Sequence, residues 1–179
     1  MFSTIQAIDE SVIIFVQEHI RNGILTPVMV FFSIIGDSGA VWLILSAAMI
    51  ITKKYRRAGI LLLASVAVSW VMNDLILKPL IGRARPFEVI EGLEVLISLP
   101  RSYSFPSGHA CSSFAAAYAL TRGVPKYGKW FYVPAALIAA SRVYLGVHYL
   151  SDIMVGIAVG TVGSIVIYWI CVKCKKRIV

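Results

Sequence analysis

Long segments without charge dominate the pattern of apolar positions along the chain. The residues from Ile153 to Val172 include no Asp, Glu, Lys or Arg over 20 positions, and a helix of about 20 apolar residues crosses the hydrocarbon core of a bilayer. Other uncharged segments run from Gly23 to Gly36, from Ser38 to Thr52 and from Ala58 to Asn73. Since backbone polar groups in hydrocarbon must bond within their own segment, this pattern predicts an all-α fold, a polytopic bundle of membrane helices.

The ends of the apolar segments give the expected spans. Five are expected near residues 39–52, 58–78, 107–121, 130–146 and 148–171. Leu25 to Ile35 is short for a full crossing, but a helix that continues into Gly36-Asp37-Ser38-Gly39 can reach the membrane surface and turn back. With this segment, the sequence predicts about six transmembrane helices, which are joined by short loops.

The N-terminal residues follow a different pattern. Apolar residues recur from Ile5 to Val16, and the acidic residues Asp9, Glu10 and Glu18 interrupt them. This alternation predicts an amphipathic helix at the membrane interface. The chain opens without a basic stretch or a small-residue cleavage pattern, so no secretory signal is expected. No internal repeat or linker is found, and residues 1–179 are predicted to form a single membrane-embedded domain.

Composition excludes a soluble domain and assigns most of the positive charge to topology. The chain is 59% hydrophobic and 15% charged, with a mean hydropathy of +0.82. Eleven of its 17 Lys and Arg residues fall into three clusters, within Lys53–Arg57, Arg122–Lys129 and Lys173–Arg177. Short cytoplasmic loops are rich in Lys and Arg, so all three clusters are expected in the cytoplasm. The net charge of +8 therefore does not indicate a nucleic-acid partner.

Cysteine and histidine give no metal site. Three cysteines cannot form a disulfide framework. Cys171 and Cys174 form a C-x-x-C at the end of the last span, but no second pair of Cys or His accompanies them. The sequence predicts neither a metal nor another cofactor.

Cations gather first at Lys78, Arg83 and Arg85-Pro86. Lys78 is followed by Pro79, which disfavours helical geometry in the residue before it, so the helix is expected to end at Lys78. Asp74 lies four residues earlier, at the spacing where opposite charges on a helix meet. One interpretation is a phosphate-binding group, and the other is a set of interfacial cations that extend to lipid headgroups.

The second group is Pro106-Ser107-Gly108-His109, which precedes an apolar run. Ser107 is expected to cap the helix that follows, and the free amides at a helix start bind anions. Gly108 permits close approach of a ligand, and His109 lies where it can reach an oxygen of a bound phosphate ester. Taken alone, a histidine beside a helix cap is more often structural, but its position beside an anion site favours a catalytic role.

The third group runs from Ser141-Arg142 to His148 and Asp152. Gly146 permits a turn, after which His148 and Asp152 lie four positions apart at the start of the last helix and so share a face. Asp152 can accept a hydrogen bond from one ring nitrogen of His148 and leave the other nitrogen as a nucleophile. A buried His–Asp pair with a purely structural role is the alternative.

Together these three groups resemble the three-part signature of the type 2 phosphatidic acid phosphatase family. The resemblance covers roughly Lys78 to Asp152 by motif. It implies a metal-independent phosphatase in which His148 attacks phosphorus and forms a phosphohistidine, Asp152 orients His148, and His109 protonates the leaving oxygen. It also implies a set of residues that bind the phosphoryl oxygens, namely Lys78, Arg85, Ser107, Gly108 and Arg142.

The expected substrate is a phosphorylated lipid whose tail stays in the bilayer. Compact bacterial members of the family include undecaprenyl-diphosphate phosphatases, and the predicted topology, with the site on the extracytoplasmic side of the cell membrane, suits hydrolysis of undecaprenyl diphosphate to undecaprenyl phosphate and phosphate. Phosphatidylglycerophosphate and phosphatidic acid phosphatases share the signature and remain alternatives. So does a protein that binds or transports a phospholipid without cleaving it. Charged and aromatic loop residues are candidates for headgroup selection: Arg83, Glu88, Glu91, Glu94, Arg101 and Tyr103.

Overall fold

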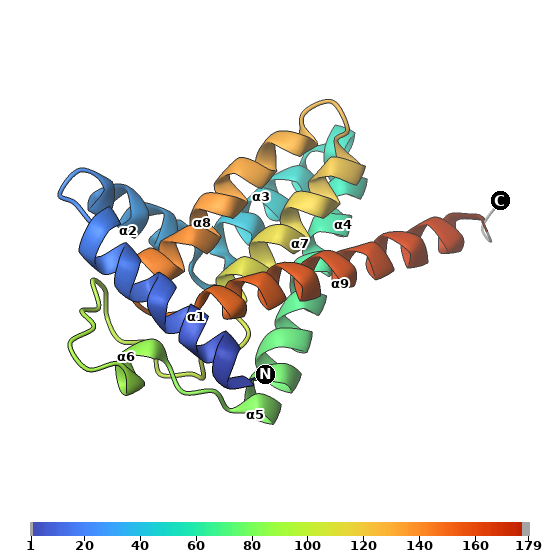
Figure 1. Ribbon diagram of the computed structural model, residues 1–179. Helices are drawn as coiled ribbons and strands as arrows, with labels where there is room; N and C mark the ends of the chain where they lie inside the picture. Colours follow the sequence, from blue (N-terminus) through green and yellow to red (C-terminus); the bar gives the residue numbers. More distant parts are fainter. Residues whose placement is uncertain (1, 177–179) are drawn as a thin grey trace.

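The computed structural model describes residues 2–176, which form helices, turns and loops without a β-strand in that range. Figure 1 shows the arrangement of the helices. The α-helices are α1 (Phe2–Phe15), α2 (Leu25–Gly36), α3 (Ala40–Ile51), α4 (Arg56–Trp70), α5 (Lys78–Ile81), α6 (Pro86–Val89), α7 (Gly108–Gly123), α8 (Tyr132–Tyr144) and α9 (Leu150–Lys176). Short π or 3-10 segments are η1 (Val16–Ile20), η2 (Asp37–Gly39), η3 (Lys53–Tyr55), η4 (Val71–Leu77) and η5 (Gly128–Phe131). The all-α prediction is confirmed.

Helix α7 lies at the centre of the bundle and packs against α4, α8 and α9. Its sequence is rich in Ala, Ser and Gly, and nine of its residues are buried. Small side chains let helix backbones approach closely, which is how helices associate where the solvent is lipid. Gly156 and Gly160 of α9 face the backbone of α7, because a Cβ at Gly160 would lie 2.0 Å from the carbonyl oxygen of Cys111.

Three helical stretches in the described residues are long and apolar enough to cross a membrane: Leu25–Ile51, Lys53–Val89 and Leu150–Lys173. The first is broken at Ser38 and Gly39, whose φ angles are +51° and +68°. The predicted turn back at this point is wrong: α2 starts beside Tyr144 at the end of α8, and α3 continues to Ser46 beside Gly59 at the start of α4, so the two halves run on in one direction. Helices α7 and α8, at 16 and 13 residues, are shorter. The count of six spans therefore stays a prediction.

The expectation that Pro79 ends the helix at Lys78 is wrong. The helix continues through α5 and stops at Gly82, whose φ of +61° leaves the helical region and whose amide bonds to the carbonyl oxygen of Lys78 at 2.9 Å. Proline is tolerated in the first turn of a helix, where its missing N–H is not needed. The π-helical segment η4 widens the turns before Lys78, so Pro79 stands at the start of a new α-helical turn.

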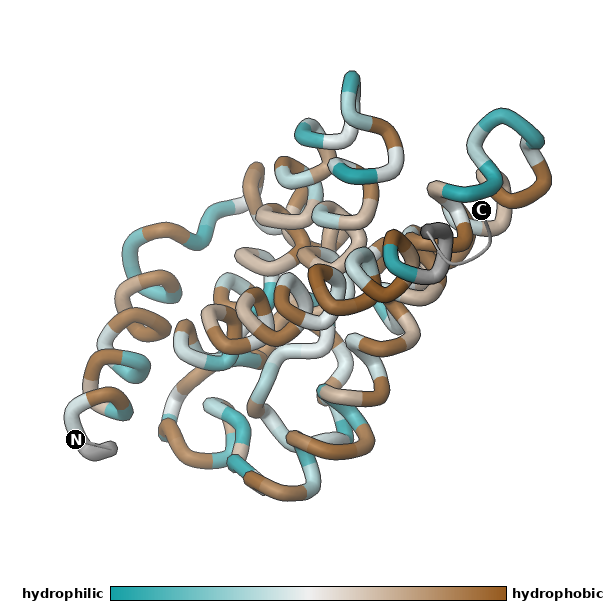
Figure 2. Tube along the Cα trace, turned by 90° about the vertical axis from the view of Figure 1, so that its right-hand side faces the viewer, coloured by the Kyte–Doolittle hydropathy of each residue, from teal (hydrophilic) through white to brown (hydrophobic). Residues whose placement is uncertain are grey.

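The basic clusters within Lys53–Arg57 and Arg122–Lys129 lie at one end of the bundle. A Cβ at Gly123, at the end of α7, would lie 2.6 Å from the side chain of Ala58, at the start of α4. The guanidinium of Arg122 lies 5.3 Å from the ring of Tyr168 in the last turns of α9. Figure 2 shows the hydrophobic helices, with hydrophilic residues gathered at turns and helix ends. Figure 1 also shows α9 projecting away from the other helices toward its C-terminal end.

Helix α1 packs across the opposite end, where α8 ends and α9 begins. Ile13 is fully buried against Ala139, Val143 and Ile153, while Ile5, Ile8, Ile14 and Phe15 are exposed. The helix predicted for the N-terminus is therefore present, with one apolar side left uncovered. Its placement at a membrane interface stays a prediction.

Candidate functional site

The three groups of residues predicted from the sequence converge on one cavity of about 940 Å³. Lys78 reaches it from the end of α4–α5, Gly108 and His109 from the first turn of α7, and Arg142 from the last turns of α8. Arg85 and His148 reach it from the loops before α6 and α9. Side chains that are up to 70 residues apart in the sequence, Lys78 and His148, thus border a common space.

His148 and Asp152 form the pair that their spacing predicted. Nδ1 of His148 lies 3.3 Å from Oδ2 of Asp152, and both side chains are buried. His148 precedes α9, which begins at Leu150, so the pair spans the turn into the helix and not its first helical turn. An imidazole whose Nδ1 faces a carboxylate carries its proton there and presents Nε2 as the basic nitrogen. Nε2 lies 3.4 Å from Nη1 of Arg85, on the cavity side.

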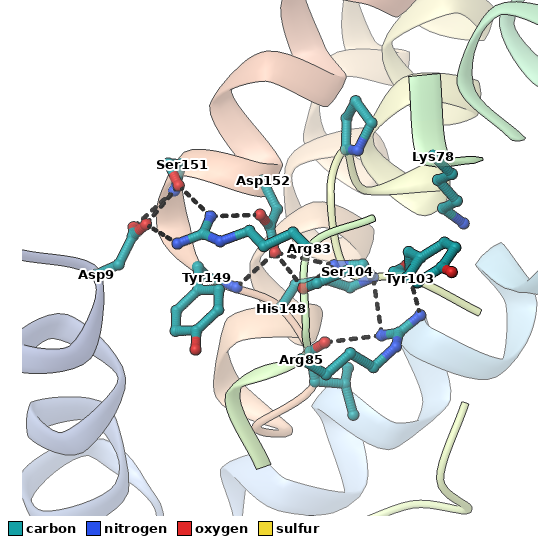
Figure 3. Close-up of polar contacts among 12 residues, drawn as sticks. Asp9, Lys78, Arg83, Arg85, Tyr103, Ser104, His148, Tyr149, Ser151 and Asp152 are labelled. Carbon is teal, nitrogen blue, oxygen red and sulfur yellow. Dashed lines mark hydrogen bonds and ion pairs between the residues drawn. The ribbon is translucent and has the colours of Figure 1, made fainter. Parts of the chain in front are cut away.

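Asp152 is held from several directions (Figure 3). Oδ2 accepts hydrogen bonds from the Ser104 hydroxyl and from the Tyr149 amide, the latter at 2.9 Å. Oδ1 accepts one from Nη1 of Arg83 at 2.7 Å. The sequence did not single out Ser104, and it placed Arg83 among the residues for the headgroup. Neither role has a signal in the local sequence, since Ser104 and Asp152 are 48 residues apart.

Arg85 is fixed by hydrogen bonds to the loops before α7 and α9 and to Glu88 of α6. Nη1 donates to the carbonyl oxygen of Val147 at 2.8 Å, and Nε donates to that of Ser102 at 2.7 Å. The Glu88 carboxylate accepts the backbone N–H of Arg85 at 2.7 Å. These bonds hold the guanidinium beside His148.

Lys78 is paired as the helical spacing predicted. Its Nζ lies 2.6 Å from Oδ1 of Asp74, one turn earlier, and 3.5 Å from the Ser102 hydroxyl. The Asp74 carboxylate also lies near Gly108, since a Cβ there would be 3.4 Å from Oδ2. Asp74 thus holds the ammonium of Lys78 close to the start of α7.

The start of α7 carries Ser107 at the N-cap position. Its hydroxyl is buried and makes no hydrogen bond to the described residues, so it does not cap the helix as expected. Its backbone N–H donates to the carbonyl oxygen of Asp152 at 3.0 Å, which ties α7 to α9. Gly108 lines the cavity, but the Ser107 amide already has a partner. Of the two amides predicted to bind phosphate, only that of Gly108 can face a ligand in this arrangement.

His109 and Arg142 share a neighbour on α2. Nε2 of His109 lies 3.2 Å from the carbonyl oxygen of Ser33, and Nη1 of Arg142 donates to the Ser33 hydroxyl. Both side chains border the cavity, as do Lys78 and Asp74. The cavity therefore has two imidazoles, three cations and a helix start on its walls.

Comparison with known proteins identifies this arrangement. Residues 57–176 match the PAP2 superfamily. The chain belongs to this superfamily. The match includes every residue predicted for the site, from Lys78 to Asp152, and covers two thirds of the chain.

Relatives of this PAP2 chain are named as phosphatases of lipids. An undecaprenyl-diphosphatase from Sulfolobus acidocaldarius is 34% identical over 76% of this chain and 66% of its own length. A decaprenylphosphoryl-5-phosphoribose phosphatase from Mycobacterium tuberculosis is 38% identical over 70% of this chain and 69% of its own. The alignments thus span about two thirds of these relatives.

A solved structure extends the PAP2 likeness to almost the whole fold. The PAP2 type phosphatidylglycerolphosphate phosphatase from Bacillus subtilis is 30% identical, with a TM-score of 0.75, over 95% of this chain and 87% of its own. With these relatives, the chain is a metal-independent membrane lipid phosphatase of the PAP2 type, and Lys and Arg side chains supply the positive charge of its cavity.

The walls of the PAP2 cavity are mixed in character. Two carboxylates, Asp37 and Asp74, lie among the three cations. Helices α2, α3 and α4 contribute an apolar wall of Val30, Ile34, Leu43, Val66, Ala67 and Trp70. A charged end and an apolar side suit a ligand with a phosphate head and a hydrocarbon tail.

The loop residues expected to select the headgroup are placed differently. Arg83 turns toward Asp9 and Asp152, and Glu88 bonds to the backbone of Arg85. The loop instead lines the cavity with Leu96, Ile97, Ser98, Pro100 and Ser102. Two of the six candidates thus have structural partners of their own.

Proposed function

We propose that this protein hydrolyses a polyprenyl diphosphate, with undecaprenyl diphosphate as its preferred substrate, on the extracytoplasmic face of the membrane. One observation carries the proposal: His148, oriented by Asp152, presents Nε2 beside Arg85 in a cavity that also holds His109, Lys78 and Arg142. The apolar wall beside these groups suits a lipid tail that stays in the bilayer.

The first step is attack of His148 Nε2 on the terminal phosphorus. A nitrogen–phosphorus bond forms, the bond from phosphorus to the bridging oxygen breaks, and His109 gives its proton to the leaving undecaprenyl phosphate. Lys78, Arg85 and Arg142, with the Gly108 amide and the Ser107 hydroxyl, hold the phosphoryl oxygens. Phosphoryl transfer depends mainly on such positioning and charge stabilisation.

The second step is hydrolysis of the phosphohistidine. Water attacks phosphorus, His109 accepts its proton, and the nitrogen–phosphorus bond breaks to release phosphate and return His148 to its starting form. Asp152 keeps the proton of His148 on Nδ1 throughout, so Nε2 is free at the start of each cycle.

The names of the relatives support the polyprenyl substrate. The Sulfolobus relative is an undecaprenyl-diphosphatase, and the Mycobacterium relative acts on another long polyprenyl carrier by its name. A glycerolipid is the alternative, favoured by the Bacillus subtilis structure and by a phosphatidylglycerophosphatase B that is 36% identical over 59% of this chain and 55% of its own length. The charged groups of the cavity contact only phosphate in this mechanism, so they do not distinguish a polyprenyl lipid from a glycerolipid.

The test compares initial rates of phosphate release from undecaprenyl diphosphate, phosphatidylglycerophosphate and phosphatidic acid in one detergent. We expect the fastest release from undecaprenyl diphosphate, and His148→Ala is expected to lower that rate by about a thousandfold or more. His19→Ala is the matched control, because His19 is exposed on η1, and its rate should stay within twofold of the parent. Equal release by the parent and His148→Ala would exclude the phosphohistidine, and no release by the parent would favour a lipid-binding protein.

A further inference from the structure

Arg83 joins the N-terminal helix to the pair of His148 and Asp152. Figure 3 shows its guanidinium between two carboxylates. Nη1 lies 2.7 Å from Oδ1 of Asp152, and Nη2 lies 2.8 Å from Oδ2 of Asp9. Its charge also lies over the ring of Tyr149, 4.0 Å from the centroid. One side chain thus contacts α1 and the carboxylate behind His148.

Asp9 is tightly held at the other side of Arg83. Its exposed fraction is 2%. Oδ1 accepts the backbone N–H of Ser151 at 2.9 Å, and Oδ2 accepts the Ser151 hydroxyl. Gln6, one turn earlier on α1, accepts a hydrogen bond from Nη2 of Arg83 at 2.6 Å. Asp9 therefore anchors α1 to the residue next to Asp152 and to the cation that contacts Asp152.

Burying the charges of Asp9, Arg83 and Asp152 has a cost in free energy. Removing charges from water costs several kcal/mol per ion, about as much as their attraction returns. The two carboxylates hold the cation in place, and α1 is also docked by apolar contacts such as that of Ile13.

We propose that Asp9 and Arg83 are positioning residues, which make helix α1 part of the catalytic apparatus by fixing the orientation of Asp152. Arg83 occupies Oδ1 of Asp152, and this contact leaves Oδ2 for Nδ1 of His148. Asp9 prevents Arg83 from swinging onto both oxygens of Asp152, because it holds the second nitrogen of the fork. The proposal rests on the proposed function, in which His148 is the nucleophile.

The test is Asp9→Asn, which keeps the size of the side chain and removes its charge. We expect kcat to fall about tenfold, the effect of about 1.4 kcal/mol on the barrier. The inhibition constant of inorganic phosphate and the KM should stay within twofold, because the phosphate-binding cations are untouched. Glu18→Gln is the matched control: it removes one acidic charge from an exposed position of the same N-terminal segment and should leave kcat unchanged. Arg83→Lys should reproduce the loss in kcat, because one ammonium cannot bridge both carboxylates, and it serves where Asp9→Asn folds poorly.

A double variant separates positioning from general damage to the fold. In single-turnover measurements with excess enzyme, Asp9→Asn should cost less than twofold when Asp152 is already Asn, because the two residues act through one group. A second tenfold loss in that background overturns the proposal, as does an unchanged kcat in both single variants or a parallel rise of the phosphate inhibition constant. Absence of turnover in the parent protein would instead overturn the proposed function.

Discussion

The guanidinium of Arg142 is only partly satisfied by hydrogen bonds to the described residues. Its Nη1 is bound to the Ser33 hydroxyl, but its buried Nε has no hydrogen-bond partner among the described residues. An unpaired buried donor costs about 1–3 kcal/mol, so Arg142 keeps its place at this cost. In the proposed function its guanidinium, which borders the cavity, donates to a phosphoryl oxygen.

Replacing Arg142 by Lys should lower kcat/KM on the lipid diphosphate about 100-fold, since loss of one oriented donor to a transition-state oxygen has effects of that size. The ammonium keeps the charge but has no planar fork to contact Ser33 and phosphate together. Steady-state rates in detergent measure the effect. Arg122→Lys, at the exposed far end of α7, is the control and should be neutral. A threefold loss or less at position 142 would show that charge alone is needed there.

At the scale of residues, the sequence predicts contacts between near neighbours. The pairs Asp74–Lys78 and His148–Asp152 follow from a separation of four positions. The contact of Arg83 with Asp9 joins residues 74 positions apart, and no periodic pattern carries that information. The same limit applies to the unpaired Ser107 hydroxyl, because its surroundings come from distant parts of the chain.

Close packing of α7 on α9 sets the geometry between the two histidine-bearing segments. Gly156 and Gly160 let the backbones meet, and α7 begins at the cavity with His109 while α9 begins beside it with Asp152 behind His148. The Ser107 amide bonds to the carbonyl oxygen of Asp152 at 3.0 Å. A wedge between these helices therefore displaces the two imidazoles relative to each other.

Gly160→Ala should destabilise the protein by about 1–3 kcal/mol, the usual cost of forcing atoms into a packed interior. The added Cβ would meet the Cys111 carbonyl oxygen at 2.0 Å, and backbone cannot move aside as a flexible side chain can. Thermal unfolding in detergent measures the shift. Gly163→Ala on the same helix is the control, since its Cβ would have ordinary contact with Val68 at 3.7 Å. Equal midpoints for the two variants would contradict tight backbone packing.

At the scale of elements, uncharged runs predict which segments are helical but not how each helix ends. The spans expected near 107–121 and 130–146 match α7 and α8 within a few residues. The continuation past Pro79 was missed because π-helical turns at η4 have no sequence signature in a uniformly apolar segment. The effect is local, yet it carries Lys78 to its place on the cavity.

The described helices have a basic end and a cavity end. The contact of Gly123 with Ala58 brings the clusters within Lys53–Arg57 and Arg122–Lys129 together, while the cavity lies at the other ends of α4, α7 and α8. Because basic loops stay in the cytoplasm, the site is expected outside. The pattern of charge along the sequence was sufficient for this prediction, since topology depends on charge counts and not on side-chain contacts.

Cysteine labelling tests the orientation. In a background with Cys171→Ser and Cys174→Ser, a membrane-impermeant maleimide applied to intact cells should label Arg101→Cys, in the exposed loop beside the cavity, and spare Lys126→Cys in the basic cluster. Both should react after the membrane is permeabilised. Labelling of position 126 alone in intact cells would place the site on the cytoplasmic side.

Asp37 and Asp74 give the cavity a property that three cations alone would not have. Three positive side chains against two negative ones give the lining of the cavity one net positive charge, so the attraction for free orthophosphate is moderate. Moderate affinity for orthophosphate favours a high turnover rate, because slow release of a tightly bound product would limit each cycle. The two carboxylates act as counterions that are fixed to the protein. In the proposed reaction the lipid phosphate replaces them as partners of the cations, and they pair with the cations again when orthophosphate leaves.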